Sequence, residues 1–157
     1  MVVVELGVLI YQGAQLAAVH GLTDLFGVAN RIAAEHQSAQ LPLLRVSHWQ
    51  VDASGKPERV FSSHPGPDQS MMAVLVPPSI GEFTEDQAPP ALLEWLRQQH
   101  AAGTVLGGVC IGSIMLARSG LLDGRTAPPT GRRPTRLQPV TRPCAWRRIN
   151  RLSMTAT

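Results

Sequence analysis

The segment Gly108-Val-Cys-Ile-Gly112 constrains the fold of this chain more than any other stretch. An apolar, β-branched run precedes it and a run with helical spacing follows it, which predicts a sharp turn from a strand into a helix. Glycine–x–nucleophile–x–glycine is the pattern of a nucleophile elbow, with Cys110 here in the place of serine. The glycines serve a steric need, because such a turn is strained and brings neighbouring backbone very close.

Cys110 itself has two interpretations. In the first turn of a helix, the helix dipole and the free N–H groups favour a thiolate and a nearby oxyanion. Cys110 would then be a nucleophile or a sensing thiol, and the backbone N–H of Ile111 would stabilise a developing negative charge. The alternative is that Cys110 is a small buried hydrophobic residue in a strand–helix turn. The five-residue motif alone leaves both open.

Apolar runs typical of buried strands alternate with amphipathic runs along the chain. The order predicts an α/β fold, a flavodoxin-like three-layer sandwich with a mostly parallel sheet, incomplete at its C-terminal side. Ligands of such sheets bind at the carboxyl ends of the strands. We predict strands at 2–11, 43–51, 59–62, 71–76 and 105–109, and helices from residue 16, over 89–102 and after Cys110.

The first predicted helix carries apolar residues at helical spacing. They fit a stripe of i, i+3, i+4 spacing, with Asn30 and Arg31 on the polar face. The stripe comprises Leu22, Leu25, Phe26, Ala29, Ile32 and Ala33.

Charge is divided sharply along the chain. Residues 1–124 hold all 11 acidic residues and 6 of the 14 basic ones, whereas residues 125–157 hold arginines and no acid. A detached basic tail is not the footprint of a DNA-reading domain, in which positive charge lies on a folded face. The two cysteines lie in different contexts and suggest no disulfide framework, so a cytoplasmic protein is expected. No membrane segment or signal peptide is predicted.

Four segments in the same order resemble one known superfamily. Residues 9–31, 74–81, 108–113 and 120–127 are similar to the first strand and helix, the two site loops and the following stretch of the ThiJ/PfpI superfamily. The chain resembles most closely the N-terminal, glutamine-amidotransferase-like domain of AraC-type transcriptional regulators. The likeness covers about residues 3–127.

The resemblance implies a domain that binds a small-molecule ligand and forms a homodimer. DNA would be bound only through a helix-turn-helix domain, and no helix-turn-helix pattern follows residue 127. Neither a cofactor nor a metal ion is expected. The implied ligand-binding residues are Gly13, Ala18, Pro78, Ser79, Ile80 and Gly108.

One departure from the superfamily affects catalysis. Enzymes of the superfamily place a carboxylate just before the first helix, where this chain has Ala18. No acid at this position can relay a proton for Cys110. His20 is an alternative base, although a lone histidine near a helix start is more often structural. Asp24 is better interpreted as a solvated or capping residue. This departure favours a sensing pocket over a turnover site.

A second departure begins after the stretch that resembles the superfamily. We interpret residues 1–127 as the domain and residues 128–157 as a basic, Pro/Arg-rich, disordered tail. Shifted by two bases, the codons of Pro129-Thr-Gly131 can encode the His-Trp that the superfamily has here. Our hypothesis is a frameshift near Ala127, which the coding DNA would test. A basic arm for nucleic acid is the weaker alternative.

Three functions stay open on the sequence. The first is the ligand-sensing, dimerising domain of an AraC-type regulator. The second is a cysteine-dependent hydrolase or hydratase of the isonitrile hydratase kind, in which Cys110 attacks a small carbonyl or nitrile-like substrate. There the N–H of Ile111 and a backbone N–H from the Pro78-Ser-Ile80 loop would stabilise the anion. The third is an inactive remnant. A non-enzymatic role is favoured because Ala18 replaces the expected acid.

Overall fold

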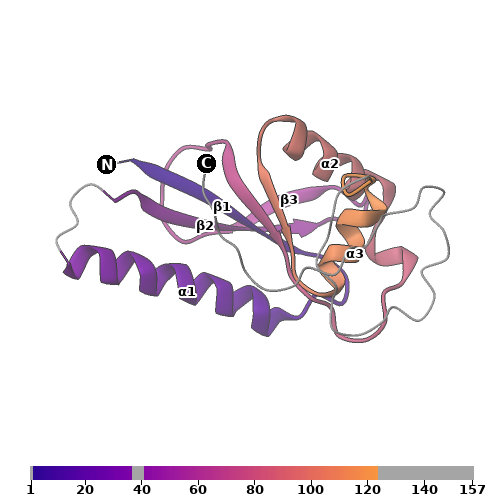
Figure 1. Ribbon diagram of the computed structural model, residues 1–157, viewed down its shortest axis with the longest axis horizontal. Coiled ribbons are helices and arrows are strands. Elements are labelled where there is room, and N and C mark those ends of the chain that lie inside the picture. Colours follow the sequence, from indigo (N-terminus) through magenta and orange to yellow (C-terminus); the bar gives the residue numbers. More distant parts are fainter. Residues whose placement is uncertain (1, 37–40, 124–157) are drawn as a thin grey trace, which may run out of the picture.

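A computed structural model describes residues 2–36 and 41–123 of the 157-residue chain. They form one five-stranded sheet in the order β3-β2-β1-β4-β5, with three α-helices (Figure 1). Strands β1, β2, β4 and β5 are parallel and β3 is antiparallel to β2. The elements are β1 (Val3–Ile10), α1 (Leu16–Glu35), β2 (Leu43–Val51), β3 (Pro57–Ser62), β4 (Met71–Val76), the 3-10 helix η1 (Glu85–Gln87), α2 (Pro90–Ala101), β5 (Val105–Gly108) and α3 (Ile111–Arg118).

The predicted α/β fold with a mostly parallel, flavodoxin-like sheet is therefore confirmed. The predicted bounds of β2 and β4 match the structure, and β3 starts two residues earlier than predicted. The short helix η1 was not predicted, because a three-residue helix has no periodicity to reveal it. The tail at 128–157, and with it the frameshift hypothesis, lies outside the described residues.

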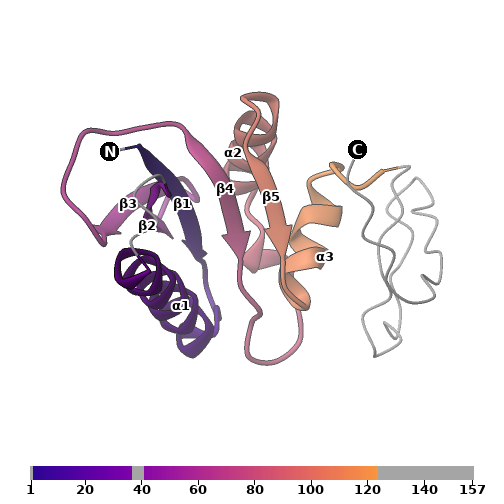
Figure 2. The same cartoon turned by 60° about the vertical axis from the view of Figure 1, so that its left-hand side comes forward.

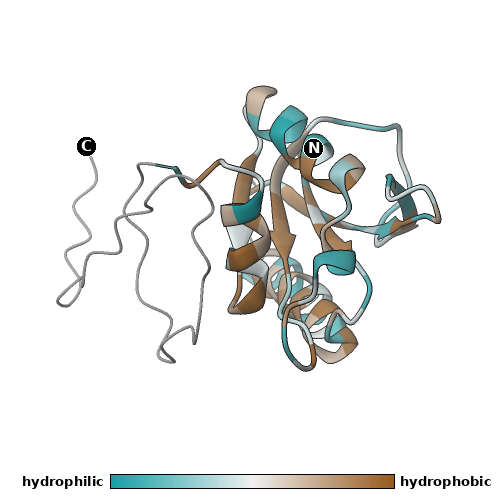
Figure 3. Ribbon diagram, turned by 90° about the vertical axis from the view of Figure 1, so that its right-hand side faces the viewer, coloured by the Kyte–Doolittle hydropathy of each residue, from teal (hydrophilic) through white to brown (hydrophobic). Residues whose placement is uncertain are grey.

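Alternate residues of β1 face two separate cores. Val8 packs with Val19 of α1 on one face of the sheet. Leu9 lies in a larger core with residues of α2 and α3, such as Leu96 and Met115. Because neighbouring residues of a strand point to opposite faces, α1 and α2 cover opposite faces of the sheet. Figure 2 shows α1 in front of β1 and β2, α2 behind β4 and β5, and α3 beside β5. The central strands are strongly apolar (Figure 3).

The apolar stripe predicted for α1 does not face the sheet as one surface. Phe26 packs against the sheet, whereas Leu25 and Ile32 are exposed. Asn30 does not lie on a polar face, since its side-chain amide donates to the carbonyl of Leu44 and accepts from the N–H of Leu44. The physical reason is that α1 packs mainly on β1 and β2, so a narrow face of the helix is enough to cover them.

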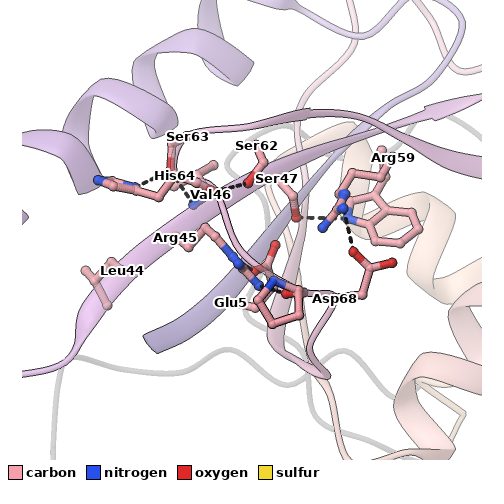
Figure 4. A network of polar contacts seen from close by, with 12 residues as sticks. Glu5, Leu44, Arg45, Val46, Ser47, Arg59, Ser62, Ser63, His64 and Asp68 are labelled. Carbon is pink, nitrogen blue, oxygen red and sulfur yellow. Dashed lines mark hydrogen bonds and ion pairs between the residues drawn. The ribbon is translucent and has the colours of Figure 1, made fainter. Parts of the chain in front are cut away.

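A buried ion pair links the neighbouring strands β1 and β2. Glu5 of β1 and Arg45 of β2 are direct neighbours in the parallel register, and the Arg45 guanidinium donates to the Glu5 carboxylate (Figure 4). Arg45 also donates to the carbonyl of Pro67 at 2.8 Å. The second carboxylate oxygen of Glu5 is buried without a hydrogen-bond partner among the described residues. Among the described residues, Arg45 is therefore the one charged partner of the Glu5 carboxylate.

Among the described residues, no helix combines the length and the apolar character that a membrane span requires.

Candidate functional site

The chain turns from β5 into α3 at Cys110. The backbone of Cys110 has a conformation that non-glycine residues rarely adopt. Cys110 has φ 54° and ψ −116°, and it is the one non-glycine residue with positive φ among those described. It directly precedes the first residue of α3 and is exposed. Backbone strain of this kind persists only where the surroundings impose it, and it is common at functional sites.

Two glycines impose the turn. A Cβ on Gly112 would lie 2.2 Å from the carbonyl oxygen of Val76, and a Cβ on Gly108 would lie 2.7 Å from the backbone of Ser113. Both contacts are with backbone, which cannot move aside. The structure thus confirms the steric need for glycine that the motif predicts, and it shows that the end of β4 is the close neighbour.

Hydrogen bonds fix the turn from both sides. The N–H of Val109 donates to the carbonyl of Val76 at 3.0 Å. The Ser113 hydroxyl donates to the carbonyl of Gly108 at 2.8 Å, and the Ser113 N–H donates to the carbonyl of Cys110 at 3.0 Å. Ser113 therefore ties the first turn of α3 back to the end of β5, which holds the thiol at the carboxyl edge of the sheet.

The loops after β1 and β4 are joined to each other at this same edge. The N–H of Gln15 donates to the carbonyl of Pro78 at 2.8 Å, and the N–H of Ile80 donates to the carbonyl of Gly13 at 2.9 Å. Gly13 has φ 79°, and a Cβ there would lie 2.6 Å from the side-chain nitrogen of Gln87. The predicted ligand-binding residues Gly13, Pro78 and Ile80 are thus brought together by backbone pairing.

The backbone donors near Cys110 can now be assigned. Ile111 is the first residue of α3, so its N–H has no acceptor within the helix. In the Pro78-Ser-Ile80 loop, proline has no N–H, and the N–H of Ile80 is already bound to Gly13. Ser79 is therefore the residue of this loop whose backbone N–H has no acceptor among the described residues.

Tyr11 is a site residue that the sequence reasoning did not identify. Its hydroxyl is buried and donates to the carbonyl of Pro77 at 2.7 Å. The pKa of Tyr11 is raised to about 12: burial is the largest cause, the hydrogen bond with the Ser79 hydroxyl opposes it, and the nearby Cys110 adds to it. Its position at the end of β1 was the available signal, since side chains at strand carboxyl ends face the ligand edge.

His20, the predicted alternative base, lies on the exposed side of α1 with its ring edge-on to His48 of β2, at 5.8 Å between ring centroids. The Thr23 hydroxyl donates to the carbonyl of Val19 and lies 2.7 Å from the Nε2 of His48. Because the Thr23 hydroxyl donates its proton to Val19, it can only accept from His48, and Nε2 of His48 is the donor in that contact. The described contacts of His20 are thus with a histidine on β2, and its role as a base stays a prediction.

Burial, and next the charge of His20, hold the pKa of His48 below its usual 6.5. The unfolded chain therefore binds more protons just below that pH than the folded chain does. We expect the free energy of unfolding to fall as the pH drops from about 7 through 6.5 toward the folded-state pKa. Urea unfolding of the wild type and of His48→Gln across this range checks the sign. The same pH dependence in both proteins would show that His48 is not responsible.

A polar cavity of about 350 Å³ opens beside the carboxyl edge of the sheet. It lies at the ends of β1 and β2 and includes Tyr11 among its walls. The polar residues that line it are Gln12, Asp52, Ser54, Asp86 and Gln87. Within residues 2–36 and 41–123, no three His, Cys, Asp or Glu residues gather in a way that could hold a metal ion.

Comparison with known proteins gives a fold and one short sequence match. No family model matches the chain. A stretch of 38 residues is 55% identical to the HTH-type transcriptional regulator CdhR of Pseudomonas aeruginosa, covering 24% of this chain and 11% of that protein. An AraC family transcriptional regulator from Pseudomonas putida matches with a TM-score of 0.54 at 15% identity, over 80% of this chain and 65% of that chain.

A transcriptional regulator protein from Vibrio parahaemolyticus matches equally well, with a TM-score of 0.52 at 20% identity, over 80% of this chain and 66% of that one. The chain thus spans about two thirds of the length of these solved regulator chains and about a tenth of the curated relative. At these identities the solved structures establish a shared fold.

Proposed function

We propose that this chain is the ligand-sensing, dimerising domain of an AraC-type transcriptional regulator, with the turn at Cys110 at the centre of its ligand site. The observation that carries the proposal is the strained, exposed Cys110 at the carboxyl edge of the sheet, held beside the loops after β1 and β4. The fold shared with two transcriptional regulators and the short match to a third support the regulatory context. In the proposal, the α/β domain described above does not bind DNA itself. DNA is bound by a separate helix-turn-helix domain.

The chemistry of the site supports binding without turnover. Ser79 and Ile111 offer backbone donors to an anionic or carbonyl group of a ligand. Turnover would also need a group that accepts and returns a proton near neutral pH. Ala18 has no such group, and Tyr11, with a pKa raised to about 12, holds its proton and donates it to Pro77. The thiol is therefore placed to contact a ligand, and His20 is the one candidate base that the sequence analysis leaves.

A second candidate is the cysteine-dependent hydrolase or hydratase. The positive φ of Cys110 and its place at the start of α3 favour it, because enzymes use this geometry to present a nucleophile. The two candidates differ in one observable: the enzyme consumes its substrate, whereas the sensor binds its ligand and releases it unchanged.

Thermal unfolding of the full chain with single L-amino acids, their primary amides and small carboxylates tests the proposal. A ligand at about 100 times its Kd adds about 2.7 kcal/mol to the free energy of unfolding. We expect at least one compound to raise Tm by roughly 5 to 10 °C, the usual response of a chain of this size. Product release is measured in the same mixtures, for the wild type and for Cys110→Ser.

Stabilisation without product supports the sensing domain. Ammonia released from an amide, or consumption of an added isonitrile, by the wild type and not by Cys110→Ser would replace it with the hydrolase or hydratase. A chain that none of these compounds stabilises would contradict the sensing role.

A further inference from the structure

The polar cavity at the ends of β1 and β2 has ionisable walls that carry charge of one sign. Asp52, in the turn between β2 and β3, and Asp86 of η1 line it, whereas no Lys, Arg or His among the described residues does so. Neither carboxylate forms an ion pair with a described residue. The volume of about 350 Å³ is in the range of small-molecule sites. A positively charged group is therefore the electrostatic complement of this cavity.

Asp52 is held in place and ionised by its own turn. One oxygen of its carboxylate accepts from the N–H groups of Ser54 and Lys56, at 2.8 and 2.9 Å, and from the Ser54 hydroxyl at 2.7 Å. These hydrogen bonds, that of the Ser54 side chain above all, hold the pKa of Asp52 below its usual range. The second carboxylate oxygen has no hydrogen-bond partner among the described residues, so it can accept from a ligand.

The turn that carries Asp52 is packed on the start of α2. Gly55 of this turn is buried and has φ 82°, and a Cβ on it would lie 2.9 Å from the side chain of Pro89. Pro89 also lines the cavity and follows η1 closely in sequence. The two acidic walls, which come from distant parts of the chain, are therefore fixed relative to each other before any ligand binds.

A buried amide completes the wall. Gln87 is 6% exposed, and its side-chain oxygen accepts from the N–H of Thr84 at 3.3 Å. Its side-chain nitrogen lines the same region and has no acceptor among the described residues. Gly13 makes room for this nitrogen, since a Cβ there would lie 2.6 Å from it. A buried N–H without an acceptor is unfavourable, so an oxygen atom of a ligand is a physical use for it.

Two carboxylates and two carboxamides thus line one cavity. The second carboxamide is that of Gln12, which follows β1 and is exposed. An ionised carboxylate can only accept hydrogen bonds, whereas the amide group of glutamine supplies two N–H donors. The carboxylates therefore suit an ammonium group, and the amide N–H groups suit a carboxylate. A small molecule that carries both groups matches both sets of wall residues.

We propose that this cavity binds the charged groups of a small amino acid, with the ammonium at the two carboxylates and the ligand carboxylate at the two carboxamides. The proposal rests on the proposed sensing function and names the class of its ligand. Tyr11 connects the cavity with the turn at Cys110. It lines the cavity, and its hydroxyl donates to the carbonyl of Pro77, directly after the strand end that is hydrogen-bonded to that turn.

Calorimetric titration of the full chain with matched probes tests the ligand class. L-alanine is compared with propanoate, which lacks the ammonium, and with ethylammonium, which lacks the carboxylate. In the same way 4-aminobutanoate is compared with butanoate and propylammonium. We expect one of the two amino acids to bind about 10-fold or more tightly than both of its analogues, because each analogue lacks one set of charge-assisted hydrogen bonds. Analogues that bind as tightly as their amino acids would overturn the proposal, as would a chain that binds neither amino acid.

Two nearly isosteric variants test the wall residues. Asp86→Asn removes one charge and is expected to lower the preference for the amino acid over its carboxylate analogue roughly 2- to 5-fold. Gln87→Glu keeps an oxygen for the N–H of Thr84 but replaces the N–H donors with a negative charge. It should therefore bind the alkylammonium more tightly than the amino acid. Asp24→Asn is the matched control, since α1 covers the opposite face of the sheet from α2, and this variant should bind like the wild type.

The outcomes separate the cavity from the rest of the account. Amino-acid binding that is unchanged in both Asp86→Asn and Gln87→Glu would overturn the cavity as the binding site. A compound without an ammonium group that stabilises the chain and protects Cys110 from alkylation would overturn the cavity and leave the sensing function in place. Amino-acid binding that both variants weaken, with no protection of Cys110, would support the cavity and contradict a ligand site centred on the turn.

Discussion

Gly112→Ala is expected to destabilise the fold by about 3 kcal/mol or more, the upper end of the cost of overpacking a core. The added Cβ would lie 2.2 Å from the carbonyl oxygen of Val76 and 2.9 Å from that of Pro77. Both atoms belong to the backbone, and the Val76 carbonyl also accepts from Val109. Either α3 moves away from β4 or this hydrogen bond is lost. Urea unfolding of the purified variant measures the difference.

Gly21→Ala is the matched control for that prediction. It makes the same chemical change, also within a helix, where a Cβ meets open space. Alanine in a helix interior is favoured over glycine by about 1 kcal/mol, so this variant should be slightly more stable than the wild type. Equal losses in both variants would show that the close approach of Gly112 to β4 does not determine the stability of the turn.

Arg45→Met is expected to cost about 3 to 5 kcal/mol, because it leaves the Glu5 carboxylate buried without its charged partner. Glu5 is 3% exposed and Arg45 is 2% exposed, so neither group can turn to water without moving the strands. The substitution also frees the carbonyl of Pro67, which accepts from Arg45. Chemical unfolding at constant pH checks the size of the loss.

The double variant Glu5→Met with Arg45→Met distinguishes a charge effect from a packing effect. Replacing a buried ion pair with apolar residues is often neutral, so the double variant should recover most of the stability lost in Arg45→Met. Losses that simply add would show that the Arg45 side chain matters for its packing and not for its charge.

Strand β4 could be predicted closely because its residues are apolar without interruption, and β2 because apolar and polar residues alternate along it. Runs such as Met71–Val76 have few alternatives once glycine and proline bound them. The glycine pattern around Cys110 could be predicted for a steric reason, because a close approach of backbone leaves no room for a side chain. Both features depend on residues that are close in sequence, so they can be predicted from a single sequence.

The contacts that depend on strand order could not be predicted. Glu5 and Arg45 meet because β1 and β2 pair in one register, and Tyr11 reaches Pro77 across 66 residues of sequence. Leu25 has the spacing of a core residue, yet its side chain is exposed because no further element among those described covers that side of α1. Periodicity indicates which residues share a face of a helix, and it does not indicate what lies against that face.

Protection of Cys110 from alkylation tests the proposed ligand site most directly. The full chain is treated with iodoacetamide, with and without a compound that stabilises it, and the modified peptides are quantified by mass spectrometry. A ligand seated at the turn is expected to slow alkylation of Cys110 several-fold and to leave alkylation of Cys144 unchanged. A stabilising ligand that leaves the alkylation rate of Cys110 unchanged would contradict the placement of the ligand site at this turn.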